Sequence, residues 1–74
     1  MTHRTLLFAD QGRGIYLSKP DAAGTVFYCV WPTRDVWRAR TTDPGGNVID
    51  LGVHHTLDGA MIACNRYDGA RRPE

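Results

Sequence analysis

The sequence predicts an α+β protein, in which an antiparallel meander of four to five strands is followed by one carboxy-terminal helix packed across the sheet. Short runs of β-branched and aromatic residues recur between turns that contain Gly, Pro and Asp. These turns are too short for the crossover that a parallel return requires, so neighbouring strands are expected to be antiparallel. Residues 57–68 alone repeat apolar side chains at helical spacing.

The expected strands lie at residues 5–9, 15–18, 25–31, 36–42 and 47–53. Residues 25–31, T-V-F-Y-C-V-W, have the composition most typical of a strand. Pro32 is expected to end that strand, because proline has no N–H for the ladder. The first strand, residues 5–9, is an exposed edge that would pair with its copy in a symmetric dimer.

Strand alternation divides the last two strands into faces. One face of the fourth strand carries Trp37, Ala39 and Thr41, and the other carries Arg38, Arg40 and Thr42. On the fifth strand the apolar set that is expected to meet the helix is Ile49, Leu51 and Val53, while Val48, Asp50 and Gly52 point outward. Both faces of residues 25–31 are apolar, so the sequence leaves open which of them is buried.

The helix is expected to begin after Thr56, whose hydroxyl can cap a free backbone N–H, with Asp58 placed favourably in the first turn. Its predicted buried stripe is Leu57, Ala60, Met61, Cys64 and Tyr67, and the residues mainly off the stripe are Asp58, Asn65, Arg66 and Asp68. Gly59 suggests a close approach of the helix to the sheet. Gly69 is the expected end, followed by a polar tail at residues 70–74.

Length and composition limit the functions that need to be considered. The chain has 74 residues, enough for one small domain over residues 1–74, and its formal net charge is +1. Dedicated nucleic-acid binders usually carry a stronger basic excess. Two cysteines, Cys29 and Cys64, are too few for a disulfide scaffold and are expected to pack as small apolar side chains, with a strand-to-helix disulfide or a redox role as the alternative, so their redox state is left open. Without a leader or an apolar run of membrane length, a cytoplasmic protein with no membrane partner is expected.

Catalytic and metal-binding patterns are weak in this sequence. His54 and His55 form the one histidine pair, and adjacent histidines rarely converge on one metal ion. Ser18 is the one serine, and no nucleophile–base set can be identified. Residues 12–14, G-R-G, lack the glycine spacing of a phosphate-binding loop and fit a hairpin turn. The sequence therefore predicts a protein that is not an enzyme and needs no metal or cofactor.

Arginines concentrate around the fourth strand, and this suggests a nucleic-acid-binding face. Arg38 and Arg40, supported by Arg34 and positioned by Trp37, would contact phosphates or guanine edges, which the guanidinium fork matches bidentately. Alternatively, these arginines bind no ligand and only form the solvent-exposed face of the antiparallel sheet. A further alternative is a protein interface, in which Tyr28 and Trp31 join the same arginines in the composition of a binding hot spot.

Residues 37–70 resemble the second half of the ethylene-response-factor type DNA-binding domain, whose relatives occur in phage and mobile-element integrases. The matching residues are Trp37, Ala39, Asp43, Pro44, Leu51, Gly52, Thr56, Ala60, Ala63, Tyr67 and Asp68. The resemblance implies a three-stranded sheet that enters the major groove with a helix behind it, and it places Trp37, Arg40 and Thr42 on the DNA side. No basic residue lies in Val26–Trp31, where the family usually has arginines, and Val48 and Asp50 replace its basic or aromatic positions.

Two functions are therefore expected. The first is a small nucleic-acid-binding protein of a phage or mobile element that uses an arginine-bearing sheet face. The second is a protein-interaction module, an inhibitor or regulator of a host protein, that binds no nucleic acid. A homodimer is compatible with both. The candidate contact residues are Tyr28, Trp31, Arg34, Trp37, Arg38, Arg40 and Thr42.

Overall fold

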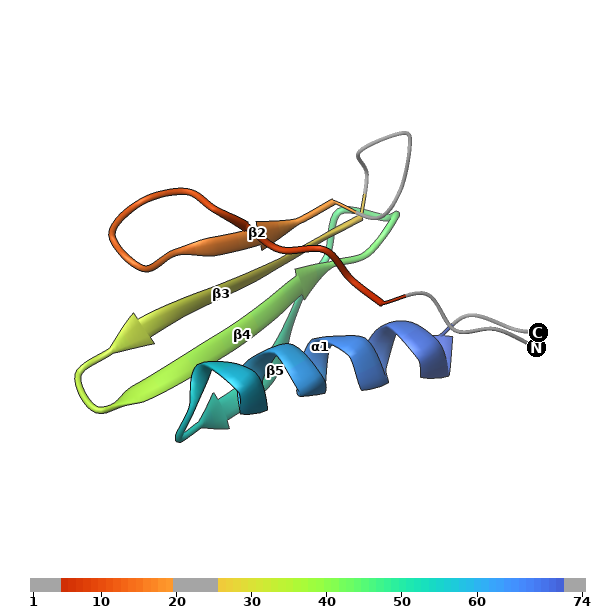
Figure 1. Cartoon of the computed structure of the whole chain (residues 1–74). Coiled ribbons are helices and arrows are strands. Elements are labelled where there is room, and N and C mark those ends of the chain that lie inside the picture. The colour runs from red at the N-terminus through yellow and green to blue at the C-terminus, as the bar shows by residue number, and fades with distance from the viewer. Residues whose placement is uncertain (1–4, 20–25, 72–74) are drawn as a thin grey trace.

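The computed structural model describes residues 5–19 and 26–71, and it has the predicted α+β architecture (Figure 1). One five-stranded antiparallel sheet has the strand order β1-β2-β3-β4-β5, so every strand pairs with its neighbour in the sequence. The elements are β1 (Ala9–Asp10), β2 (Tyr16–Ser18), β3 (Phe27–Thr33), β4 (Val36–Thr42), β5 (Val48–His54) and α1 (Leu57–Arg71).

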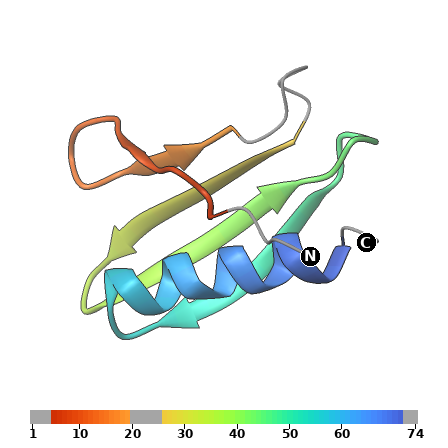
Figure 2. The ribbon, with the colours of Figure 1, turned by 45° about the vertical axis from the view of Figure 1, so that its right-hand side comes forward.

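Helix α1 lies across one face of the sheet, where it packs on β4 and β5 and less extensively on β3 (Figure 2). The segment at residues 5–8 lies on the same side, because Leu6 is buried in the core and its N–H donates to Asn65 Oδ1 of α1 at 2.8 Å. We call this the helix-side face. The opposite face, which we call the open face, is covered by no element within residues 5–19 and 26–71.

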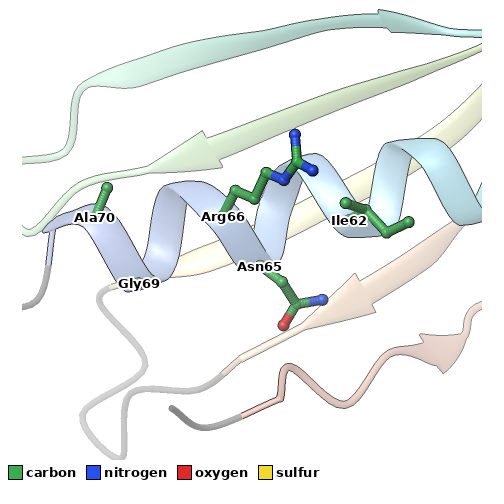
Figure 3. Close-up of a pocket in the computed structure, with 5 residues that line it drawn as sticks. All are labelled: Ile62, Asn65, Arg66, Gly69 and Ala70. Carbon is green, nitrogen blue, oxygen red and sulfur yellow. The ribbon is translucent and has the colours of Figure 1, made fainter.

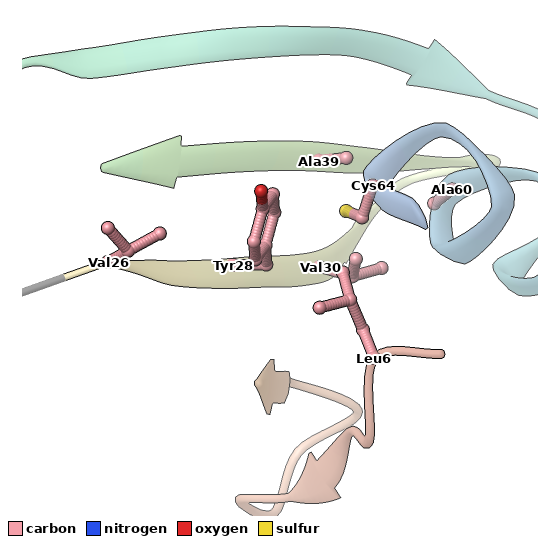
Figure 4. Packing of buried hydrophobic residues seen from close by; sticks show 7 residues of the cluster. All are labelled: Leu6, Val26, Tyr28, Val30, Ala39, Ala60 and Cys64. Carbon is pink, nitrogen blue, oxygen red and sulfur yellow. The ribbon is translucent and has the colours of Figure 1, made fainter. Parts of the chain in front are cut away.

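The core lies between α1, β3 and β4 (Figure 4). Its buried apolar residues are Leu6, Val26, Tyr28, Val30, Ala39, Ala60 and Cys64. Three of these, Ala39, Ala60 and Cys64, are small, which lets the helix approach the sheet closely. The expected cap is confirmed, since the Gly59 N–H donates to Thr56 Oγ1 at 2.9 Å. A Cβ on Gly59 would lie 3.1 Å from that oxygen and 3.5 Å from His54 Cβ, so the small residue fits the close contact between α1 and the end of β5.

The helix departs from its predicted stripe at Asp68. This carboxylate was expected off the buried stripe, yet it is 1% exposed and accepts a hydrogen bond from the Tyr28 hydroxyl at 2.9 Å. The helix also continues to Arg71 instead of ending at Gly69. Residues 72–74 of the expected tail lie outside the described residues.

Strand β3 continues through Pro32, which was expected to end it. Thr33 and Val36 close a two-residue turn, so the next pair, Pro32 and Trp37, falls at a position where the strands exchange no hydrogen bonds. The absent N–H of Pro32 would therefore point away from β4, toward a region that β2 does not reach, because Tyr16 at the start of β2 pairs with Val30. Gly14 approaches the Pro32 ring there, since an added Cβ would lie 3.2 Å from Pro32 Cγ, but it forms no strand pairing, and proline is tolerated where a strand has no paired strand on that side.

The first strand is shorter than expected. Only Ala9 and Asp10 pair with β2, and residues 5–8 have no regular structure. The predicted strand at residues 5–9 is therefore wrong in its bounds, since the paired residues are Ala9 and Asp10. Leu6 is held against α1 through Asn65 instead.

A β-bulge in β5 makes the prediction of its helix-facing residues wrong at Val53. Arg40 pairs with Asp50 and Arg38 with Val53, so Leu51 and Gly52 both lie opposite Ala39. Gly52 adopts a φ of 94°, which glycine accepts without steric cost. The extra residue reverses the alternation, so Val53 leaves the helix-side set of Ile49 and Leu51 and is 53% exposed on the open face.

Candidate binding face

Cross-strand partners share a face of a sheet, so the pairing registers define the residues of the open face. They form four rows across the strands: Phe27, Thr42 and Val48; Ala9, Leu17, Cys29, Arg40 and Asp50; Trp31, Arg38 and Val53; and Thr33 and Val36. The rows mix aromatic and aliphatic side chains with two arginines and one aspartate. The solvent side of an antiparallel sheet is normally polar, so this composition is unusual for an uncovered face.

The two arginines of β4 lean toward different neighbouring strands. Arg40 pairs directly with Cys29, but its guanidinium carbon lies 5.0 Å from the ring centroid of Trp31, the diagonal residue on β3. Arg38 turns the other way, and its Nη2 donates to Asp50 Oδ2 of β5 at 3.3 Å. Side-chain exposures of 41% for Arg38 and 64% for Asp50 leave this ion pair in water, where it contributes little to stability.

Asp50 uses both of its carboxylate oxygens within the sheet. Oδ2 accepts from Arg38, while Oδ1 accepts from the N–H of Gly52 at 2.8 Å and so fixes the bulge. It is the one carboxylate in strands β3, β4 and β5. Arg40 is thus left without a carboxylate partner among the described residues, and its contact with Trp31 is a cation–π interaction.

These side chains surround a shallow hollow of about 270 Å³ on the open face. It is lined by Trp31, Arg38, Arg40, Val48 and Asp50. Val48 is 62% exposed at the rim of the hollow. The site therefore combines exposed apolar surface, one ion-paired arginine and one exposed arginine that has no carboxylate partner among the described residues.

The predicted contact residues separate into two groups. Trp31, Arg38, Arg40 and Thr42 lie together on the open face, as strand alternation predicted for the last three. Arg34 lies beside this face in the exposed β3–β4 turn, where its φ of 53° is unusual for a residue other than glycine.

Tyr28 and Trp37 do not belong to this surface. Tyr28 is fully buried on the helix-side face, so its ring cannot serve a partner. Trp37 is half-buried on that same side, with its ring centroid 6.3 Å from that of Tyr16. The resemblance had placed Trp37 on the DNA side together with Arg40, and the structure places these two residues on opposite faces.

Sequence reasoning missed several residues of the open face. Leu17 and Cys29 join it through their pairing with each other and with Arg40, and Val53 joins it through the bulge. The glycine within a strand-like run was the available signal for that bulge. Burial raises the pKa of the Cys29 thiol above its ordinary value of 9.0, against an opposing effect of Arg40. Cys29 is therefore a protonated, apolar contact at neutral pH.

A second hollow, of about 510 Å³, lies along α1 (Figure 3). The described residues that line it are Ile62, Asn65, Arg66, Gly69 and Ala70. Asn65 has a structural role there, because its Oδ1 holds the Leu6 N–H and its Nδ2 donates to the Met61 carbonyl at 2.9 Å. This hollow therefore adjoins the attachment of the amino-terminal segment to α1.

Within the described ranges, no cluster of three or more His, Cys, Asp or Glu side chains is arranged to hold a metal ion. Nor does this part of the chain contain a helix with the length and apolar character needed to cross a membrane. Comparison with protein-family models, curated proteins and solved structures finds no match for the chain.

Proposed function

We propose that the protein is a small protein-interaction module whose open face binds its partner. The observation that carries this proposal is the composition of that face, where the exposed side chains of Val48 and Val53 accompany the cation–π contact of Arg40 with Trp31. Tryptophan and arginine are enriched in binding hot spots, which are most effective when apolar neighbours exclude water around them. Val48 and Val53 lie on the same face and offer such neighbours.

The partner that we propose is a host protein, with the chain acting in the cytoplasm as a small inhibitor or regulator encoded by a phage or mobile element. A near-neutral chain is suited to such a role, because it does not bind polyanions through bulk charge. The binding itself would depend on shape and apolar contact at the open face.

Nucleic-acid binding is the second candidate, and one observation favours it. The Arg40 guanidinium lies over Trp31 and has no carboxylate partner among the described residues, and such planar groups stack on bases and contact phosphates. The β3–β4–β5 meander followed by α1 also has the arrangement that the family resemblance implied. Asp50 weighs against this function, because its carboxylate lies within the same hollow and repels phosphate.

A display selection tests the principal proposal. Random peptides displayed on phage would be selected on the immobilised protein, and their contacts mapped by chemical-shift changes in ¹H–¹⁵N spectra. We expect the changes to fall on the outward residues of β3–β5 and binding to be lost in Val48→Ser. Ile62→Ser is the matched control, since Ile62 is 51% exposed on α1 and Val48 is 62% exposed on the sheet. Selected peptides that map to α1 instead would refute the proposal.

A salt titration separates the two candidates. The affinity for duplex or single-stranded DNA should fall by about one logarithmic unit per logarithmic unit of salt for each phosphate contact, whereas an apolar protein interface should respond little. Tight, strongly salt-dependent binding of mixed-sequence DNA that Arg40→Gln abolishes would favour the nucleic-acid function over protein binding.

A further inference from the structure

We propose that Arg40 is an anchor for a carboxylate, so that the partner of the open face is an acidic protein segment that places one Asp or Glu side chain in the hollow beside Trp31. This inference rests on the proposed protein-binding function and specifies the chemistry of its ligand. Its basis is the unequal pairing of the two arginines on β4.

No carboxylate in strands β3, β4 or β5 forms an ion pair with Arg40. Asp50 pairs directly with Arg40 across the strands, yet its oxygens accept from Arg38 and from the Gly52 N–H, and no ion pair joins it to Arg40. No other Asp or Glu occurs in β3, β4 or β5. The face thus carries two arginines against one aspartate, and a complementary ligand brings one negative charge.

The contact with Trp31 prepares Arg40 for such a ligand. The cation–π contact, with the guanidinium carbon 5.0 Å from the ring centroid, limits the orientations of a side chain that is otherwise exposed to solvent. A carboxylate can accept hydrogen bonds from two guanidinium N–H groups in a bidentate arrangement. Less side-chain conformational entropy is lost on binding when the guanidinium is already ordered. Val48 beside the hollow would contact the apolar part of the same partner segment.

A second copy of the chain fits this site less well. Two open faces placed together would bring four arginines against two aspartates, which leaves both Arg40 side chains unmatched. Pairing through sheet edges is also disfavoured, because β1 is two residues long and β5 is interrupted by the bulge at Gly52. A nucleic acid presents a row of phosphates, so several negative charges would lie near Asp50, whereas an acidic segment with one carboxylate at Arg40 brings a single charge there.

Matched peptide libraries provide the test. Two phage libraries would be identical except that the central position is Asp or Glu in one and Asn or Gln in the other. The wild-type protein should enrich the acidic library about tenfold more, which is the factor that one charge-assisted hydrogen bond contributes. Arg40→Gln should remove this preference. Arg66→Gln, the same charge change at an exposed position on α1, should keep it.

The possible outcomes distinguish this inference from the proposed function. Peptides that map to the open face but enrich equally from both libraries would overturn the carboxylate anchor and leave the protein-binding function standing. Enrichment that Arg40→Gln does not change would do the same. Peptides that map elsewhere, a dimer mass in light scattering with the open face protected, or displacement of the peptides by an oligonucleotide at physiological salt would each overturn the inference.

Discussion

The hydroxyl of Tyr28 donates a hydrogen bond to Asp68 Oδ1 at 2.9 Å, between two buried side chains on β3 and α1. The bond joins the middle strand of the sheet to the carboxy-terminal half of the helix. Burial of a carboxylate is unfavourable unless hydrogen bonds replace its lost hydration. The contact therefore fixes where the end of α1 rests on the sheet.

Substitution of Tyr28 by Phe should lower the free energy of unfolding by about 1–3 kcal/mol, because Asp68 loses a buried donor while the ring remains. Urea denaturation followed by tryptophan fluorescence would measure the change. Tyr67→Phe is the control: that ring packs edge-on at 6.5 Å from Tyr28, but its hydroxyl makes no hydrogen bond within the described residues. Equal stability of the two variants would contradict a structural role for the Tyr28–Asp68 bond.

The bulge gives a second prediction. Gly52→Ala should destabilise the fold by about 1–2 kcal/mol, because a φ of 94° is unfavourable for an L-residue. The added Cβ would meet its nearest neighbour, His54 Nε2, at 3.7 Å, so the cost comes from the backbone and not from crowding. A synthetic chain with D-alanine at position 52, measured by the same denaturation, should keep the stability of the wild type. If both enantiomers were equally harmful, the explanation from the dihedral angle would be wrong.

The buried thiol of Cys64 should make the free energy of unfolding depend on pH. Burial raises the pKa of its thiol from 9.0 to about 12, so the folded chain keeps a proton that the unfolded chain releases. The free energy of unfolding should be insensitive to this group below about pH 8 and should fall as the pH rises from about 9 toward 12. Urea titrations from about pH 7 to about pH 10.5 would show a smaller decline in Cys64→Ala than in the wild type. Parallel curves for the two proteins would contradict this assignment.

Much of the fold follows from local signals in the sequence. The range of β4 and the Thr56 cap were expected from alternation and side-chain chemistry, and both depend on residues close together in the chain. Asp68 was misplaced because its burial depends on Tyr28, 40 positions away, which periodicity does not detect. Val53 was misplaced because one bulge reverses every later position of a strand.

The candidate site was predictable to a similar extent. Alternation placed Arg38 and Arg40 on one face and Trp37 on the other, as the structure has them. The alternation of β3 left open whether Tyr28 or Trp31 would be exposed, since both sides of that strand are apolar. Tyr28 is the buried residue of the two, and its hydroxyl donates to the buried Asp68 carboxylate. Trp31 lies on the open face in contact with Arg40.

Asp50 provides the last prediction. Asp50→Asn should strengthen binding of acidic peptides to the open face, because it removes the negative charge beside Arg40 and frees Arg38 from its ion pair. The asparagine oxygen can still accept from the Gly52 N–H, so the bulge should be preserved. Isothermal titration of one selected acidic peptide should give a several-fold lower Kd than the wild type, and the gain should shrink as salt is added. Asp58→Asn, the same charge change in the first turn of α1, should leave the Kd unchanged. Weaker binding by Asp50→Asn would mean that the ligand donates to Asp50, and that the partner of the open face is basic at this point and not acidic.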